Sequence, residues 1–320
     1  MKTRSIIAAA AAALLSAAAG AQQYPVKPVR VVIPWPPGGS NDVVGRIVTQ
    51  KLSETMGQQF IVDNRGGASG VIGAESVAKS PPDGYTLMIH SATHVSNPHL
   101  YGKVPYDTLK DFAAVAPLSV QIGMLVVHPA LPVKSVKEFV ALAKSKPGQL
   151  TYSSSGNGSF VHLSMALFAS MAGIKMTHVP YKGGGPAAIS IASGETQAQM
   201  GTVGSVIQQV KQNRVRALAV TSDKRVDAFP NLPTISEAGV PGYEFTAWIG
   251  MLAPANTPRP IVDRLNAEVN KVLKMPDVAQ NLKSQTLEPL IMTPDQFARR
   301  LKSDYDKYEK VVKLTGAKID

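Results

Sequence analysis

The stretch Pro34-Trp35-Pro36-Pro37-Gly38-Gly39-Ser40-Asn41-Asp42 joins two segments of different periodicity. Before it, residues 29–33 are apolar and β-branched, which is typical of a buried strand. After it, apolar residues recur at helical spacing as far as Gly57, which predicts a helix that begins near Ser40. Flexible glycines and a serine N-cap would let amide groups at the helix N-terminus converge on one anion. An ordinary strand-to-helix connection needs the same residue types, so this stretch by itself leaves both interpretations open.

The pattern of strand, loop and helix continues after this first helix. Strands are predicted at 60–63 and 85–90, with a short helix at 71–79 between them. Alternating strands and helices indicate a parallel sheet that is covered on both faces. Ligands bind beyond the carboxyl ends of the strands in such sheets. Three loops would share that rim: 38–42, 65–70 and 91–97.

The opening arrangement recurs in the middle of the chain. Residues 150–154 are predicted to form a strand, Ser155-Gly156-Asn157-Gly158-Ser159 is a loop of small residues, and a helix follows. The second half therefore has a predicted anion site of its own. Two apolar segments, 119–127 and 246–254, bracket this central block. A chain that leaves one domain, builds a second and returns makes a two-stranded hinge, and closure around a small ligand follows from that geometry.

The remaining elements follow from the same patterns. Further strands are predicted at 176–180, 198–202 and 217–221. Further helices are predicted at 135–146, 206–213, 259–273, 276–284 and 294–314.

Composition restricts the class of protein. The chain has 320 residues, a formal charge of +11 and no cysteine, which excludes disulfides, thiolate nucleophiles and cysteine metal sites. A chain of this length favours two domains. Lysine and arginine are spread along the chain and only 6% of residues are aromatic, so we expect no nucleic-acid binding.

The N-terminus has the pattern of a secretory signal peptide. Lys2 and Arg4 precede an apolar run, and Ala19-Gly20-Ala21 has the form of a cleavage site. We therefore expect residues 1–21 to be removed and the mature protein to be soluble and periplasmic. The apolar run is shorter than the roughly 20 residues that span a bilayer, which argues against a membrane anchor.

Enzyme signatures are missing from the sequence. It contains no G-x-S-x-G, H-E-x-x-H or G-x-x-x-x-G-K-[ST] motif, and its six histidines lack metal-ligand spacing. We expect a protein that is not an enzyme and that needs no metal and no cofactor. One enzymatic alternative stays open, an exported hydrolase with Ser155 or Ser159 as nucleophile beside His162.

Seven short motifs are spread over the chain after the predicted signal. They are Pro34-Trp35-Pro36-Pro37-Gly38-Gly39 with Asp42, Asn64-Arg65-x-Gly67-Ala68-x-Gly70-x-Ile72-Gly73-Ala74, Pro82-Asp83-Gly84-Tyr85-Thr86-Leu87, Pro105-Tyr106-Asp107 with Lys110-Asp111-Phe112, Ser154-Ser155-Gly156-x-Gly158-Ser159, His178-Val179-Pro180-Tyr181-Lys182-Gly183, and Pro233-Thr234-Ile235-Ser236-Glu237-Ala238-Gly239. As a set, they closely resemble the Bug (TctC-type) extracytoplasmic solute receptors. These are the periplasmic binding components of tripartite tricarboxylate transporters.

The resemblance implies an α/β fold of the class II-like periplasmic binding protein type. Two parallel or mixed sheets flanked by helices would form two lobes, joined by a two-strand hinge. Lobe 1 is expected at 22–124 and 245–320, and lobe 2 at 125–244. The implied partners are a small carboxylate and the membrane subunits of the transporter, and we expect a monomer. An alternative of another class is a ligand-binding receptor for a membrane signalling partner.

The family's ligand-binding positions carry over to both loops. In the first loop they are Gly38, Gly39, Ser40 and Asp42. In the second loop they are Ser155, Gly156, Gly158 and Ser159. Trp35 stands where phenylalanine or tyrosine is commoner, and Asn41 and Asn157 occupy variable positions. The predicted ligand-binding set is completed by Trp35, Asn157, Thr93 and Thr202.

Four of the side chains near these loops have a second interpretation. Asp42 would repel an anion, so we expect its carboxylate to accept loop amides and fix the loop. Trp35 would either stack on a planar ligand or cover the floor of the cleft. We expect His162 to be packed, and Arg65 either neutralises a second carboxylate or is solvated.

Overall fold

The computed structural model describes residues 24–284 and 287–317, so the predicted signal peptide lies outside the described residues. Ten strands form a curled sheet in the order β2-β1-β3-β9-β4-β7-β5-β6, with β8 and β10 each paired with β4. The strands are Val29–Ile33 (β1), Phe60–Asn64 (β2), Thr86–Ser91 (β3), Phe112–Val127 (β4), Thr151–Ser154 (β5), Thr177–Pro180 (β6), Ala198–Thr202 (β7), Arg216–Val220 (β8), Thr246–Pro254 (β9) and Glu288–Pro289 (β10).

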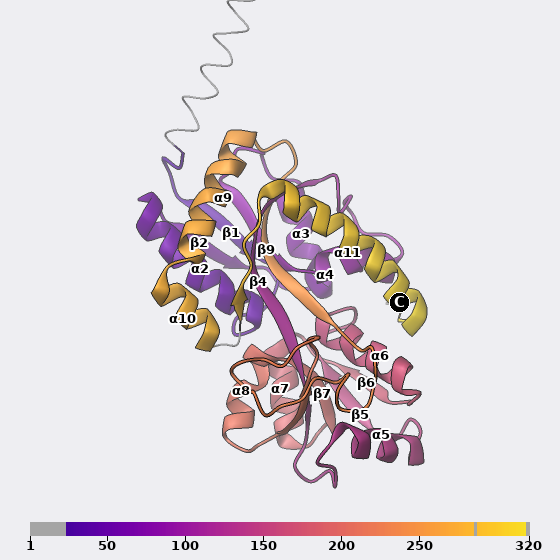
Figure 1. Cartoon of the computed structure of the whole chain (residues 1–320). Helices are drawn as coiled ribbons and strands as arrows, with labels where there is room; N and C mark the ends of the chain where they lie inside the picture. Colours follow the sequence, from indigo (N-terminus) through magenta and orange to yellow (C-terminus); the bar gives the residue numbers. More distant parts are fainter. Residues whose placement is uncertain (1–23, 285–286, 318–320) are drawn as a thin grey trace, which may run out of the picture.

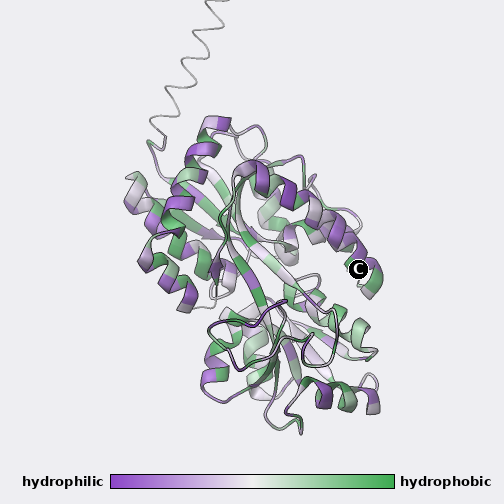
Figure 2. Cartoon of the chain, in the orientation of Figure 1, coloured by the Kyte–Doolittle hydropathy of each residue, from purple (hydrophilic) through white to green (hydrophobic). Residues whose placement is uncertain are grey.

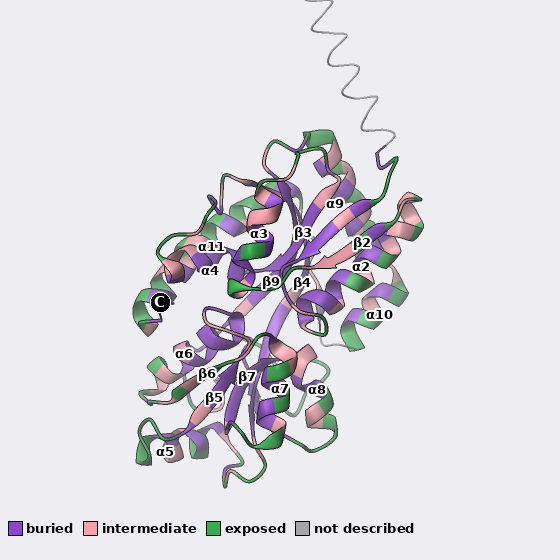
Figure 3. Cartoon of the chain, turned by 180° about the vertical axis from the view of Figure 1, so that it is seen from behind, coloured by how far each residue is buried: buried purple, intermediate pink, exposed green. Residues whose placement is uncertain are grey.

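Helices cover both faces of these strands. They are Ser40–Met56 (α2), Val71–Ala78 (α3), Thr93–Tyr101 (α4), Val136–Ser145 (α5), Phe160–Ala172 (α6), Gly184–Ser193 (α7), Val203–Lys211 (α8), Arg259–Leu273 (α9), Pro276–Ser284 (α10) and Pro294–Thr315 (α11), with a 3-10 turn at Ala68–Gly70 (η1). Figure 3 shows buried strands between helices whose outer faces are exposed. No helix in the described ranges is long and apolar enough to cross a membrane.

Strand β4 belongs to two groups of strands. In the first group β1 is parallel to β2 and β3, and β9 runs antiparallel between β3 and β4. Beyond Ile122, β4 pairs antiparallel with β7 and β8, while β5 is parallel to β6 and β7. The fold is thus a mixed α/β sheet, as expected. Figure 1 shows β4 and β9 running together from one group of strands to the other.

The two predicted crossing segments are neighbours in the sheet. Their register places Ile122 opposite Thr246 and Phe112 opposite Pro254. Residues from β4 and β9 are almost all buried, because helices cover both of their faces. Figure 2 shows apolar colour along β4, whereas the visible face of α11 is largely hydrophilic.

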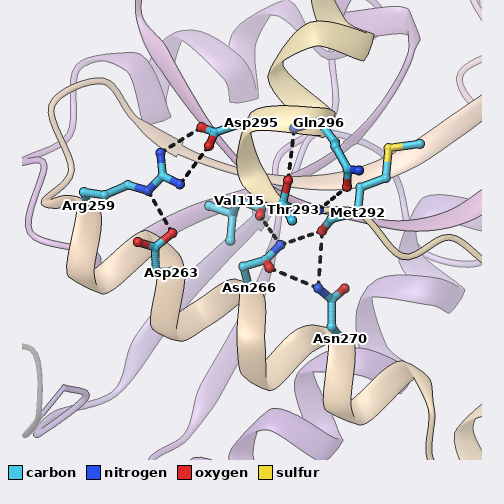
Figure 4. A network of polar contacts seen from close by, with 9 residues as sticks. All are labelled: Val115, Arg259, Asp263, Asn266, Asn270, Met292, Thr293, Asp295 and Gln296. Atoms are coloured by element: carbon cyan, nitrogen blue, oxygen red, sulfur yellow. Dashed lines mark hydrogen bonds and ion pairs between the residues drawn. The ribbon is translucent and has the colours of Figure 1, made fainter.

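A polar network fixes the C-terminal segment to the first group of strands (Figure 4). Asn266 on α9 donates to the carbonyl oxygen of Val115 at 2.8 Å and to that of Met292 at 2.9 Å. Its own oxygen accepts from Asn270 at 3.0 Å. From this anchor α11 runs along α4 and β4 and also contacts α6. Helix α11 therefore touches both groups of strands.

Two elements differ from the sequence-based expectation. Residues 91–97 were expected to form a rim loop, but a helix begins at Thr93 directly after β3. Residues 93–97 are all buried, so the segment has no amphipathic pattern, and Pro98 further weakens the helical signal. Strand β4 begins at Phe112, earlier than predicted, because register shifts on both sides of Ala116 accommodate Pro117 in the strand.

Candidate functional site

The loop between β1 and α2 is held by Asp42. Its carboxylate accepts the amide of Gly38 at 3.0 Å and the side-chain amide of Asn64 at 3.0 Å. Arg46 donates to both carboxylate oxygens at 3.0 Å. Burial raises the pKa of Asp42, but the hydrogen bonds from Arg46, Asn64 and the loop amide outweigh this and hold the pKa below its usual range. The predicted structural role of Asp42 is confirmed.

Ser40 does not cap α2, contrary to the prediction. The N-cap is Gly39, with an ordinary φ of −86°, and it is Gly38 that needs the left-handed conformation at φ 87°. Ser40 is the first helical residue, and its hydroxyl donates to Thr202 Oγ1 at 2.9 Å. Thr202 in turn donates to Ser205 Oγ at 2.9 Å. This chain of hydroxyl groups ties α2 to the junction of β7 and α8.

The second loop is built as the sequence predicts. Ser159 caps α6 by accepting the amide of His162 at 3.2 Å. Gly156 and Gly158 have positive φ values of 123° and 71°, which only glycine adopts readily. His162 is buried, and its Nδ1 accepts the amide of Gly158 at 3.0 Å. His162 is therefore a packed residue that fixes the loop, as expected.

Behind the second loop lies a stack of three rings. The rings of His162 and His178 are 4.1 Å apart and nearly parallel, and the ring of Tyr152 stacks beside them, 4.9 Å from that of His178 and 6.4 Å from that of His162. Burial lowers the pKa of His162 to about 4. Burial, and then the neighbouring His162, lower the pKa of His178 to about 3. Both histidines are thus neutral at physiological pH.

Trp35 is fixed by a buried histidine. Its indole Nε1 donates to His90 Nδ1 at 3.4 Å, and the same nitrogen of His90 accepts the amide of Ser91 at 2.8 Å. Burial, and then His94, hold the pKa of His90 well below its usual range, so it remains a neutral acceptor. Trp35 is only 8% exposed, and it lines the cavity described next.

A small cavity of about 40 Å³ lies between the two glycine loops. Five helices begin at its wall. They are α2 at Gly39 to Asn41, α4 at Thr93, α6 at Ser159 to Val161, α7 at Gly183 to Pro186, and α8 after Thr202. The first amides of each helix have no partner within the helix, and the helix dipole adds a partial positive charge there. An anion is the ligand that such an arrangement stabilises.

None of the residues that line this inner cavity is charged. Its polar wall consists of hydroxyl groups, two carboxamides and backbone. In the described ranges, no cluster of three or more His, Cys, Asp or Glu residues is placed to hold a metal ion. The inner cavity thus offers neutral hydrogen-bond donors to an anion.

An outer cavity of about 510 Å³ adjoins the inner one. Four residues line both: Trp35, Pro36, Ser155 and Gly183. The rest of the outer wall comes from residues 66–69, Tyr101, Gly156, Asn157 and residues 180–182. Lys182 is the charged residue in this wall. An elongated ligand with one end in the inner cavity would extend past Trp35 into the outer one.

The structure brings together seven of the twelve predicted site residues at the inner cavity: Trp35, Gly39, Ser40, Thr93, Ser155, Ser159 and Thr202. Gly156 and Asn157 line the outer cavity. Gly38, Asp42 and Gly158 line neither, and act within the loops. Arg65 is half-exposed and pairs with Asp63 at 2.8 Å, so the structure gives it a surface ion pair.

Several lining residues were missing from the predicted set. Gly183 to Gly185 could have been found from the sequence, since three glycines and a proline mark the start of a helix there. Asn41 lies between two predicted residues, and Ser91 lies two positions before Thr93. Gln121 has no local signal, because it lies in the middle of the long strand β4.

The geometry does not assemble the hydrolase alternative. The Nδ1 atom of His162 accepts an amide, and Ser159 uses its hydroxyl oxygen as a helix cap. The one serine hydroxyl with a hydrogen bond to a histidine ring in the described ranges is that of Ser154, 2.6 Å from His178 Nε2. Ser154 is fully buried and does not line the inner or the outer cavity.

Comparison with known proteins identifies relatives over nearly the whole chain. The model of the tripartite tricarboxylate transporter family receptor (TctC) matches residues 44–317. A protein of Pseudomonas sp. (strain P51), encoded in the tcbD-tcbE intergenic region, is 39% identical over 90% of this chain and 86% of its own length. Protein BugT of Bordetella pertussis is 34% identical over 93% of this chain and 92% of its own length.

Solved structures with the same fold include two that contain a carboxylate. Rpa4515 of R. palustris with adipate is 37% identical, covers 92% of this chain and all of its own, and superposes with a TM-score of 0.90. MatC of Rhodopseudomonas palustris with bound malate is 31% identical, covers 90% of this chain and all of its own, and has a TM-score of 0.85. The match to the family model and these relatives show that this chain belongs to the tripartite tricarboxylate transporter family of receptors, the Bug or TctC type.

Proposed function

We propose that this protein is a periplasmic receptor that captures a small organic carboxylate and delivers it to the membrane subunits of a tripartite tricarboxylate transporter. The observation that carries the proposal is the convergence of five helix N-termini on one cavity without a charged residue. Relatives whose structures contain adipate and malate support a carboxylate as the ligand.

The arrangement suits reversible binding. Hydrogen bonds from neutral donors to a carboxylate contribute about 1.5–3 kcal/mol each. Four or five of them, less the entropy lost on binding, reach roughly micromolar affinity, near −8 kcal/mol. A receptor that must release its ligand to a transporter needs this range, because much tighter complexes dissociate slowly.

The ligand would be enclosed by movement of two lobes about β4 and β9. We propose lobe 1 at 22–124 and 245–320, and lobe 2 at 125–244. Three hydrogen bonds cross between these parts beside the cavity: Ser40 to Thr202, Ser69 to the carbonyl oxygen of Asn157, and Ser96 to the carbonyl oxygen of Gly158. With the lobes in this position the inner cavity is small, so a ligand must enter before closure.

The two cavities suggest how a ligand would lie. The inner cavity has room for about three water molecules, which suits one carboxylate end. The outer cavity has room for the remainder of the ligand, next to the face of Trp35 and near Lys182. Ligands with rings or chains of several carbons would therefore be accommodated in the outer cavity.

Thermal unfolding with a panel of acids tests the proposal. The mature protein is mixed with monocarboxylates, dicarboxylates, tricarboxylates, amino acids and aromatic acids, and the unfolding midpoint is measured. A ligand that binds only the folded state raises the midpoint in a saturable way. The same panel of amides, which lack the anionic group, is the control. No shift with any acid, together with no acid released from denatured protein in mass spectrometry, would rule the proposal out.

Export is tested separately. We propose that residues 1–21 are removed and that the protein is periplasmic. N-terminal sequencing of the protein from a periplasmic fraction should begin near Gln22. A product that retains Met1 would contradict it.

A further inference from the structure

Two carboxamide side chains in the inner cavity have an oxygen without a partner. Asn41 on α2 is 7% exposed and Gln121 on β4 is 3% exposed, and both line the cavity. Neither Asn41 Oδ1 nor Gln121 Oε1 accepts a hydrogen bond from any residue that the structure describes. A buried carbonyl oxygen without a donor is unfavourable, and such groups normally have a partner in the functional state.

Three of the hydroxyl groups that line the cavity already donate to other residues. The hydrogen of Ser40 is directed to Thr202, and that of Thr202 to Ser205. The hydrogen of Ser91 is directed to Thr93 Oγ1 at 3.2 Å. None of these three donates to Asn41 or Gln121, and a ligand that enters the cavity can supply the missing donor.

The surroundings decide between two classes of donor on a ligand. An ammonium group would lie at the positive ends of five helices, and no acidic residue lines the cavity to stabilise it. A hydroxyl group is neutral, so it can donate to a carboxamide oxygen there while the neighbouring carboxylate receives the helix amides. A hydroxyl next to the carboxylate suits both sets of groups in a cavity of about 40 Å³.

We propose that Asn41 and Gln121 select carboxylates that carry a hydroxyl group on the adjacent carbon, that is, 2-hydroxy acids. The inference rests on the proposed function, since it assumes that a carboxylate binds in the inner cavity. It goes further in assigning these two side chains to the recognition of a second group on the ligand. The helix N-termini bind the carboxylate. The hydroxyl has one hydrogen, which one of the two carboxamide oxygens accepts, and the side-chain amide of the other carboxamide donates to the hydroxyl oxygen.

The test compares acids that differ by one hydroxyl group. The pairs are malate and succinate, 2-hydroxyadipate and adipate, and mandelate and phenylacetate, which together cover short, long and aromatic bodies. Dissociation constants are measured by isothermal titration calorimetry on protein from which any bound acid has been removed. For every pair that binds, we expect the hydroxy acid to bind about tenfold more tightly.

Two variants test the assignment to the named side chains. Gln121→Met and Asn41→Leu keep the approximate volume of the side chain and remove the carboxamide. We expect each to reduce the preference for the hydroxy acid toward equal affinity, chiefly by weakening binding of the hydroxy acid. The matched control is Gln199→Met. Gln199 is also fully buried with both polar atoms unpartnered in the described chain, but it does not line the inner cavity, so its variant should keep the preference.

The outcomes separate this inference from the proposed function. If acids bind without any preference for the hydroxy member of a pair, the proposed receptor function stands and the inference is overturned. Equal weakening of both members of a pair in the Gln121→Met and Asn41→Leu variants also overturns it, since the carboxamides would then be donating to the carboxylate. The inference is also overturned if the preference for the hydroxy acid survives in both variants. It is likewise overturned if Gln199→Met abolishes that preference. Absence of binding by every acid overturns the proposed function itself.

Discussion

Asp42 is an acidic residue in a loop that borders the proposed carboxylate-binding cavity. It is 4% exposed, and its oxygens are occupied by Gly38, Asn64 and Arg46. The charge is therefore neutralised within the loop, and the carboxylate holds the backbone in the form that presents the start of α2 to the cavity. An acid at this position supports the loop and lines neither cavity.

Gly39 offers a direct test of the cavity at the same scale. Its φ of −86° suits a β-branched residue, and a side chain there would meet no protein atom within 4 Å. Because Gly39 lines the inner cavity, Gly39→Val should fill space that the ligand needs. We expect calorimetry to show that acids bind at least about 100-fold more weakly. The free energy of unfolding without ligand should change by less than about 1 kcal/mol.

Gly39→Ala gives a graded control, with a smaller loss of affinity. Gly158 is a poor counterpart, because its φ of 71° would strain any larger residue and confuse binding with folding. Acid binding by Gly39→Val with wild-type affinity would show that the ligand lies elsewhere.

Among the elements, α9 and α11 illustrate the difference between buried and exposed polar contacts. Asn266 is 7% exposed and bridges two carbonyl oxygens that belong to β4 and to the segment before α11. Arg259, at the start of α9, makes ion pairs with Asp263 and Asp295, all of them exposed (Figure 4). The buried amide fixes the position of α11, whereas the ion pairs lie in water.

Substitutions in this network should differ in their effect on stability. We expect Asn266→Ala to lower the free energy of unfolding by about 2–4 kcal/mol, because the buried carbonyl oxygen of Val115 loses its side-chain donor and Asn270 loses the oxygen that accepts from it. Arg259→Ala should lower it by no more than about 1 kcal/mol, because solvent screens exposed ion pairs. Urea unfolding followed by circular dichroism measures both. An equal loss in the two variants would contradict the view that burial of the network decides its contribution.

At the scale of the whole molecule, three buried histidines and the half-buried His178 make the fold sensitive to acid. Burial holds the pKa values of His94 and His162 near 4 and that of His178 near 3, and that of His90 well below its usual range. In the unfolded chain each would titrate near 6.5. Between these values the unfolded state binds more protons than the folded state, so stability falls as pH falls.

We expect stability to be highest above about pH 6.5 and to fall steadily from there to about pH 4. Each buried histidine contributes a slope of up to about 1.4 kcal/mol per pH unit in that window. Urea unfolding at intervals of half a pH unit measures the decline. The variant His162→Gln, which keeps an acceptor, should have a shallower slope than the wild type. A stability that is constant from pH 7 to 4.5 would contradict the buried, neutral state of these rings.

The proposed closure is also a property of the whole molecule. If the lobes move about β4 and β9, the ligand-free protein in solution should be more extended than the structure described here. Small-angle X-ray scattering should show a decrease in the radius of gyration when a binding acid is added, and no change with its amide. A ligand-independent radius of gyration would mean that ligands enter without movement of the lobes.

The sequence by itself determined the local structure around the site. The β-branched run at 29–33, the glycine at position 38 and the apolar spacing after it predict β1, its turn and α2, because these depend on backbone preference and on neighbours a few residues apart. The same reasoning predicted the second loop with the helix that follows it, and the two crossing segments. The motifs along the chain were enough to predict the family to which the chain belongs.

Only the tertiary structure decided which groups meet. Ser40 bonds to Thr202, which is 162 residues away, so its expected role as a cap could not be corrected from its neighbours. Gln121 reaches the cavity from the middle of a strand, and α4 lacks an amphipathic pattern because its residues 93–97 are all buried. These features depend on packing between distant segments, which periodicity and turn chemistry do not encode. The number of helix N-termini at one point is such a feature, and the proposed affinity for an anion rests on it.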